Sequence, residues 1–154
     1  MPIRSEEKLY LLDISSHTLR QLKLIVPGGL IAYYFETLQE FWTIIQSGSG
    51  LARSTALAAL LSGCTTIGLF IFVLLTPWIR GVEPDFRVWR KSGILSSVIP
   101  LLTTSIVLGW LLLVMSLAHF SNSGIFRGVV GASSVYALSF GLLGLLPAPK
   151  VKRT

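Results

Sequence analysis

The sequence predicts an all-α, polytopic membrane protein, a bundle of four transmembrane helices. The chain is 52% hydrophobic and only 13% charged, whereas soluble domains carry about 25% charged residues. Its mean hydropathy is +0.71. Four spans of about 20 residues each leave too little chain for a separate soluble domain. The expected spans are residues 25–46, 54–79, 93–118 and 128–146.

The distribution of basic residues predicts how these spans are threaded. Of the 13 Lys and Arg residues, Arg53 lies in the first connection and Arg127 in the third. The others lie in the N-terminal segment 1–24, the second connection and the tail 147–154. Basic residues near span ends are retained on the cytoplasmic side during insertion. The alternation therefore predicts that both termini are cytoplasmic. The residues on that side are Arg4, Lys8, Arg20, Lys23, Arg80, Arg87, Arg90, Lys91, Lys150, Lys152 and Arg153.

The first span is the least regular of the four. It begins with Pro27-Gly28-Gly29, which disfavours a helix interior, and it contains Glu36 and Glu40. In an alternative model with three spans, this segment lies on the membrane surface. That model places six basic residues on one side and seven on the other, so the bias disappears. The charge distribution therefore favours four spans.

The connections are short, and the second is the longest. Its Phe86–Lys91 segment mixes aromatic and basic residues, which is typical of a membrane interface. We expect Trp89 at the headgroup level, with Arg87, Arg90 and Lys91 facing anionic lipid. The alternative is a cytoplasmic docking point for a partner.

Several classes of function lack their sequence signatures. Cys64 is the single cysteine, and His17 and His119 stand apart from any ligand spacing. The chain contains no phosphate-binding loop, zinc motif or nucleophile elbow. Its basic residues form no run with interleaved aromatics, as a nucleic-acid site would. We expect no cofactor, no metal ligand, no catalytic constellation and no nucleic-acid partner.

Glu36 and Glu40 are the candidates for a polar centre. On a continuous helix they would lie about 40° apart, with Tyr33 and Thr37 on the same stripe. A carboxylate at the bilayer centre costs about 2.5–3.5 kcal/mol, and the spans contain no Lys, Arg or His to compensate. Three interpretations remain open. In the first, the carboxylates pair with a cationic or hydroxyl-bearing partner, in this chain or another, and hold an assembly together. In the second, they work as a proton-binding or metal-binding pair in a small lipid enzyme or carrier. In the third, Glu40 reaches the far interface while Glu36 is protonated. The shortage of cations favours a partner.

Small residues recur in the second and fourth spans. A spacing of four allows helix backbones to approach closely, either within the bundle or against another protein. The predicted packing residues are Ala58, Ser62, Gly128, Ala132, Gly141 and Gly144.

The carboxyl end indicates where in the cell the protein is located. Lys150 and Lys152 occupy the fifth and third positions from the end, and the tail resembles the dilysine-type retrieval signal of endoplasmic reticulum membrane proteins. The resemblance implies residence in the endoplasmic reticulum or the early Golgi, with a coat protein as partner. The alternative is that these lysines simply anchor the last span.

The function expected from these features is non-catalytic. The chain is expected to be an accessory, scaffolding or assembly subunit of an endoplasmic reticulum membrane complex, packed laterally against a partner membrane protein. A chaperone that packages cargo would differ mainly by binding transiently. The alternative is a small intramembrane lipid-modifying enzyme, or a lipid or ion carrier, that uses Glu36 and Glu40. A catalytic pair should tolerate neither Gln nor Ala, whereas a hydrogen-bonding pair should often tolerate Gln.

Overall fold

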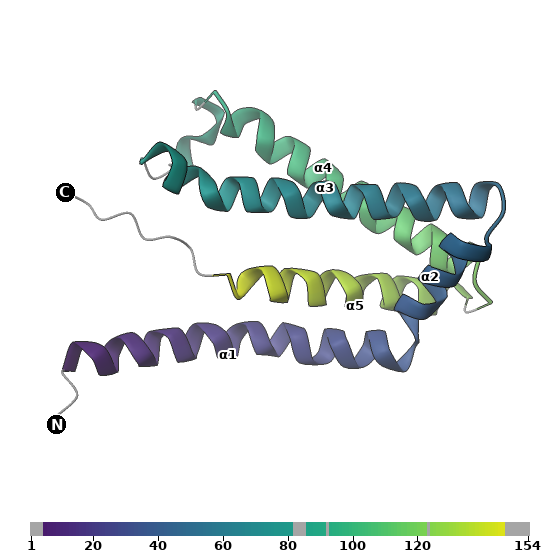
Figure 1. Ribbon diagram of the computed structural model, residues 1–154, viewed down its shortest axis with the longest axis horizontal. Coiled ribbons are helices and arrows are strands. Elements are labelled where there is room, and N and C mark those ends of the chain that lie inside the picture. The colour runs from purple at the N-terminus through teal and green to yellow at the C-terminus, as the bar shows by residue number, and fades with distance from the viewer. Residues whose placement is uncertain (1–4, 82–85, 92, 123, 147–154) are drawn as a thin grey trace.

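The part of the chain that the structure describes is entirely helical. The computed structural model describes residues 5–81, 86–91, 93–122 and 124–146 (Figure 1). Its elements are α1 (Ser5–Tyr34), α2 (Thr37–Ser47), α3 (Leu51–Arg80), the short 3₁₀ helix η1 (Phe86–Lys91), α4 (Leu95–His119) and α5 (Gly124–Gly144).

The long helices lie side by side, and α2 crosses one end of the bundle (Figure 1). α3 packs on α4, α4 on α5, and α5 on α1. The start of α1, the connection that carries η1 and the end of α5 lie at one end, which we call the basic end. Arg20, Lys23, Arg90 and Lys91 belong to it. The opposite end, which we call the α2 end, holds α2 and the α4–α5 connection.

Three helices are long and apolar enough to cross a membrane. Their mean hydropathies are 2.3 for Leu51–Ile79, 2.3 for Leu95–His119 and 1.4 for Gly124–Gly144. Their large side chains face outward, as Leu61 (69% exposed) and Leu101 (53% exposed) do. Outward-facing leucine is costly in water but neutral in hydrocarbon. The chain is therefore a multi-pass membrane protein.

The prediction of a single helical span at 25–46 is wrong. α1 begins at Ser5, continues through Pro27-Gly28-Gly29 and ends at Tyr34. The chain then turns at Phe35 and Glu36 before α2 begins. The N-terminal segment from Ser5 onward thus forms the first part of α1. Because α1 carries several charges before residue 24, it is not among the helices apolar enough to cross a membrane.

The turn gives Glu36 a left-handed backbone, with φ 50° and ψ 30°. This conformation costs a non-glycine residue about 1–2 kcal/mol. It allows α2 to leave the axis of α1, and so Thr37 and Ile44 become buried. Glu36 and Glu40 therefore do not lie on one continuous helix, because Glu36 precedes α2 as its N-cap.

Small residues bring α1 against α5. A Cβ atom at Gly28 would lie 3.0 Å from both the Leu138 amide nitrogen and the Ser134 carbonyl oxygen. Further along the same contact, Gly141 lies against Ile25 and Gly144 against Gln21. The close approach explains the glycine in the middle of α1, which the sequence indicated only as a weak point of the helix.

A small core joins α3, α4 and α5. It comprises Ala59, Leu113, Leu117 and Ala132, all buried. The Ser62 hydroxyl of α3 donates to the Ser105 carbonyl of α4 at 2.9 Å. These contacts unite α3, α4 and α5 but do not close the space between α3 and α5.

Candidate functional site

The acidic candidates lie at the α2 end of the bundle. Glu40 is partly buried, and its Oε2 accepts a hydrogen bond of 2.8 Å from the Ser121 hydroxyl. Ser121 belongs to the connection between α4 and α5. Glu36 is exposed. The preceding Phe35 ring lies 5.5 Å from the guanidinium of Arg127, near the start of α5. The break in the first span thus places both carboxylates toward the bundle end.

Tyr33 and Thr37 do not form the stripe expected of them. Tyr33 is 86% exposed at the end of α1, whereas Thr37 is 2% exposed at the start of α2. The Thr37 hydroxyl faces α5, since a Cβ atom at Gly131 would lie 2.9 Å from it. The turn at Glu36 separates these two side chains into an outward and an inward one.

The Glu40–Ser121 bond gives a first testable prediction. Hydrogen bonds to a carboxylate contribute more than neutral ones, and residues in direct contact show non-additive effects. We expect Glu40→Gln and Ser121→Ala together to destabilise the protein by less than the two single effects added, with a coupling of about 0.5–1 kcal/mol. Unfolding in detergent micelles measures this coupling, and additive effects would contradict the bond.

The packing residues lie within the bundle, in contacts of different closeness. A Cβ atom at Gly128 would lie 2.8 Å from the Ala118 Cβ of α4. Ala132 is fully buried, Ala58 is half-buried, and Ser62 makes the bond to α4 already described. Gly141 and Gly144 belong to the contact with α1.

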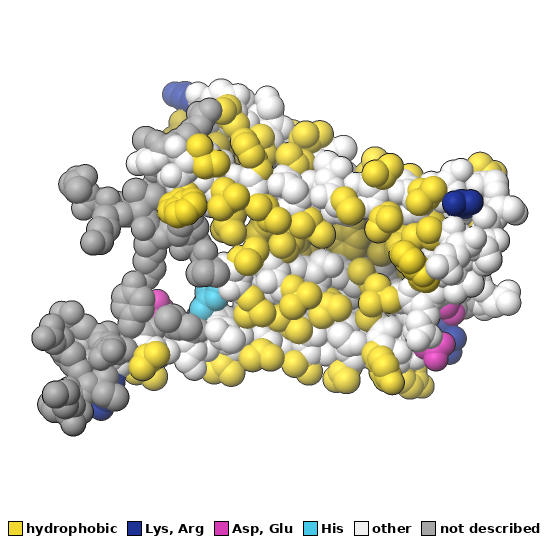
Figure 2. All heavy atoms as spheres, in the orientation of Figure 1, with side chains coloured by type: hydrophobic (Ala, Val, Ile, Leu, Met, Phe, Trp, Pro, Cys, Tyr) yellow, Lys and Arg dark blue, Asp and Glu magenta, His cyan; other side chains and the backbone are white. Residues whose placement is uncertain are grey.

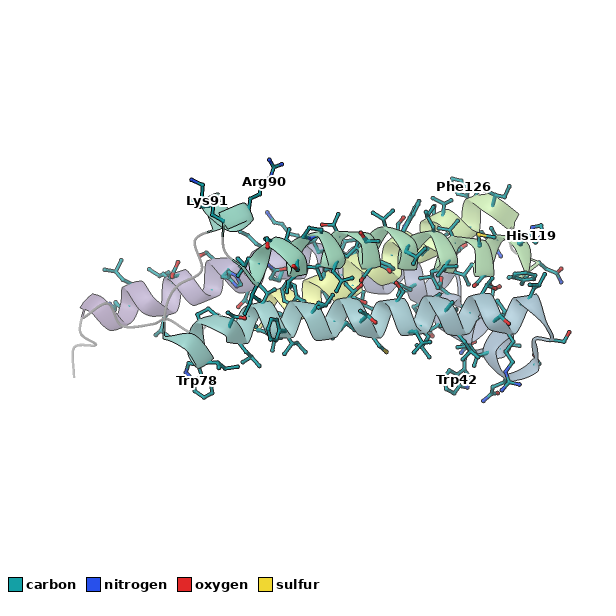
Figure 3. The ribbon with its side chains drawn as sticks, turned by 90° about the horizontal axis from the view of Figure 1, so that it is seen from above. Trp42, Trp78, Arg90, Lys91, His119 and Phe126 are labelled. Atoms are coloured by element: carbon teal, nitrogen blue, oxygen red, sulfur yellow. The ribbon has the colours of Figure 1, made fainter. Side chains whose placement is uncertain are left out.

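The lipid-facing candidates lie at the basic end. Arg90 and Lys91 are exposed, and Figure 3 shows both pointing away from the helices. Arg87 and Trp89 belong to the backbone of η1, but their side chains are outside the described part. Lys150 and Lys152 lie outside the described residues.

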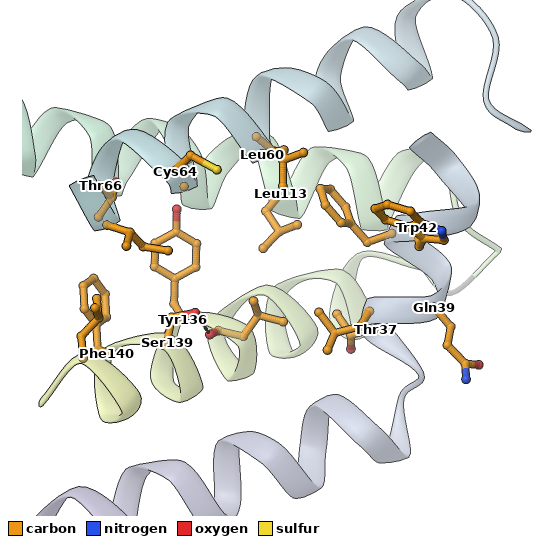
Figure 4. A pocket seen from close by; sticks show the side chains of 18 residues that line it. Thr37, Gln39, Trp42, Leu60, Cys64, Thr66, Leu113, Tyr136, Ser139 and Phe140 are labelled. Atoms are coloured by element: carbon orange, nitrogen blue, oxygen red, sulfur yellow. Dashed lines mark hydrogen bonds between the residues drawn. The ribbon is translucent and has the colours of Figure 1, made fainter. Parts of the chain in front are cut away.

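The structure also contains a pocket of about 600 Å³ between α2, α3, α4 and α5, which no sequence pattern had indicated. Figure 4 shows side chains of all four helices around it. On the face shown in Figure 2, hydrophobic side chains gather along α3 and α5 on either side of it. Its lining residues are Thr37, Leu38, Gln39, Phe41, Trp42, Ala59, Leu60, Gly63, Cys64, Thr66, Ile67, Gly109, Leu113, Val135, Tyr136, Ser139, Phe140 and Leu143.

The pocket has few polar groups available to a ligand. The Thr66 hydroxyl donates to the Ser62 carbonyl at 2.9 Å and the Ser139 hydroxyl to the Val135 carbonyl at 2.8 Å, each within its own helix. The Tyr136 side chain extends from α5 toward α3 (Figure 4). The lining has no carboxylate, amine, guanidinium or imidazole. Such a pocket can hold an apolar group but offers no acid–base pair.

The described residues contain no candidate metal site. Among the described residues, no three His, Cys, Asp or Glu side chains are grouped closely enough to hold a metal ion. Comparisons with protein-family models, with curated proteins and with solved structures gave no match to this chain.

Proposed function

We propose that the protein is a non-catalytic accessory, scaffolding or assembly subunit of a membrane complex, bound laterally to a partner membrane protein. One observation carries the proposal. The acidic residues Glu36 and Glu40 lie at the α2 end and are not among the residues that line the pocket. Neither carboxylate therefore reaches the cavity that the described residues form, which disfavours the alternative of a lipid-modifying enzyme built on these two carboxylates.

The surface beside Glu36 supports lateral binding. Tyr33 is 86% and Tyr34 80% exposed at the end of α1, directly before the exposed Glu36. Tyrosine is enriched in protein interfaces because its ring supplies area and its hydroxyl a hydrogen bond. The left-handed backbone of Glu36 lowers the stability of the chain, and packing elsewhere in the chain offsets this loss. Strained residues of this kind often lie at binding sites. We propose Tyr33, Tyr34 and Glu36 as the partner surface.

A four-span topology completes the proposal. The contacts of Gly28, Gly141 and Gly144 support α1 as a helix that lies along α5 rather than flat on the membrane. The uncharged stretch from Leu24 to Tyr34 covers about 16 Å, half of a hydrocarbon core of about 30 Å. In this proposal α1 and α2 together form the first span.

The basic end is then cytoplasmic by the distribution of Lys and Arg. With the tail on that side, Lys150 and Lys152 can act as the retrieval signal and bind a coat protein. The proposed address is the endoplasmic reticulum membrane or the early Golgi.

Affinity purification in gentle detergent tests the subunit function. The tag belongs at the N-terminus, so that the Lys150–Thr154 tail stays free. We expect a membrane protein to copurify stoichiometrically with the wild type, and to be lost from the Glu36→Ala/Glu40→Ala variant. The Glu36→Gln/Glu40→Gln variant should retain it, because an amide still forms hydrogen bonds.

Asp13→Ala is the matched control, since it also removes an exposed acidic side chain but from the distant part of α1. It should retain the partner fully. Recovery of the wild-type chain without any protein partner, or equal loss in Asp13→Ala, would overturn the proposal.

A further inference from the structure

We propose that the pocket binds one acyl chain of an anionic glycerophospholipid, taken from the leaflet at the basic end of the bundle. This site is separate from the partner surface at Tyr33, Tyr34 and Glu36. The inference needs the chain to lie in a membrane, which its three apolar helices support, but it does not need a protein partner.

The shape of the pocket fits a single chain. Along α5 its lining runs from Val135 to Leu143, and along α3 from Ala59 to Ile67. Each stretch covers about 12 Å of helix, which is within the thickness of one leaflet of about 15 Å. The volume of about 600 Å³ lies within the range of small-molecule sites.

The two ends of the pocket differ. At the α2 end, Thr37 and Trp42 of α2 border the pocket (Figure 4), and Phe41 of the same helix also lines it. At the basic end, Phe140 and Leu143 are the last lining residues of α5, and neither η1 nor the described part of α1 contributes to the lining. Among the described residues, the lining is closed by α2 at one end and receives nothing from η1 or α1 at the other, which supports entry of a chain from the basic end.

Acyl chains outside the pocket are as apolar as its lining, so hydrophobicity alone gives no preference for binding. Selectivity must come from packing and from the headgroup. Glycine supplies the space, because a Cβ atom at Gly63 would have no neighbour within 4 Å although Gly63 lines the pocket.

Charge indicates which headgroup the site prefers. Gln21 contacts Gly144 at the end of α5, so the exposed Arg20 and Lys23 beside it lie near the level at which the pocket ends. Arg90 and Lys91 lie at the same end of the bundle (Figure 3).

The described charged side chains at the basic end are Lys8, Arg20, Lys23, Arg90 and Lys91, with one acidic residue, Asp13. At the α2 end, by contrast, two basic residues are accompanied by two acidic ones. The described charged side chains there are Arg53, Arg127, Glu36 and Glu40. Basic residues at a membrane surface attract anionic lipid. The basic end therefore favours a headgroup such as phosphatidylserine over a zwitterionic one.

Native mass spectrometry of the purified full chain tests the site. The probes are dioleoyl phosphatidylserine and dioleoyl phosphatidylcholine, supplied separately in mixed micelles. We expect one phosphatidylserine per chain, retained about tenfold more than phosphatidylcholine. Gly63→Trp should abolish retention by filling the pocket.

Gly68→Trp is the matched control, since a Cβ atom at Gly68 also meets nothing within 4 Å and this residue does not line the pocket. It should bind lipid as the wild type does. Equal retention by the two tryptophan variants would overturn the pocket as the site. Equal retention of the two lipids would overturn the preference for an anionic headgroup.

A second measurement uses the wild-type chain and so does not depend on the folding of a variant. Cys64 is exposed, lines the pocket and is the single cysteine. Phosphatidylserine should slow its alkylation by N-ethylmaleimide several-fold. An unchanged rate would overturn the proposal. Neither outcome bears on partner binding at Glu36, so the two proposals can fail independently.

Discussion

Gly128→Leu is expected to lower the free energy of unfolding by about 2–3 kcal/mol, at the upper end of the range for overpacking. A Cβ atom there would lie 2.8 Å from the Ala118 Cβ and 2.9 Å from the Ala118 amide nitrogen. Because one of these atoms belongs to the backbone of α4, no change of rotamer can relieve the contact. The helices α4 and α5 must separate. Thermal or denaturant unfolding in detergent micelles measures the loss.

Gly68→Leu provides the matched comparison for this variant. It introduces the same side chain into a membrane helix at a position with open space around it. Its stability should stay within about 0.5 kcal/mol of the wild type. If the two variants were equally stable, the close approach of α4 and α5 at Gly128 would be contradicted.

The second large effect is expected at Gly28, where α1 meets α5. Gly28→Leu would place a side chain against the Leu138 amide nitrogen and the Ser134 carbonyl oxygen, each 3.0 Å from the added Cβ. We expect a loss of about 1–3 kcal/mol, concentrated in α1. Hydrogen exchange should show faster opening of α1, while α3 and α4 stay protected, because they make no contact with this site.

The adjacent Gly29 offers a close control. A Cβ atom there would have an ordinary contact of 3.7 Å with Leu138 Cδ1. Gly29→Leu should therefore leave the exchange of α1 nearly unchanged. Equal effects of Gly28→Leu and Gly29→Leu would contradict the packing of α1 against α5.

The apolar helices could be predicted from the sequence because their signal is local. Each long uncharged run corresponds to one helix: 54–79 to α3, 93–118 to α4 and 128–146 to α5. Their ends differ from the prediction by a few residues, since polar residues such as Arg53 continue a helix beyond the membrane without cost.

The break between α1 and α2 could not be predicted from the sequence. No glycine or proline marks the break at Phe35 and Glu36; it depends on the burial of Thr37 and Ile44 by distant elements. Conversely, Pro27-Gly28-Gly29 looked like a helix boundary but lies inside α1. Gly28 is needed there because α1 packs closely against α5, more than 100 residues away in the sequence.

The pocket was missed for a related reason. It lies between four helices that are separate in the sequence, and its lining has the same composition as a surface that faces lipid. Gly63 and Gly109 lie in different helices, and their sequence neighbours give no indication that both border one cavity. Only the arrangement of the helices makes them a site.

Labelling with a membrane-impermeant maleimide tests the central claim, that α1 and α2 form a fourth span. Single cysteines replace Lys8, Ser49 or Lys91 in a Cys64→Ser background, all three being exposed. In sealed vesicles of defined orientation, we expect Lys8→Cys and Lys91→Cys to label from one side and Ser49→Cys from the other. Labelling of Lys8→Cys and Ser49→Cys from the same side, opposite to Lys91→Cys, would contradict the four-span account and establish three spans.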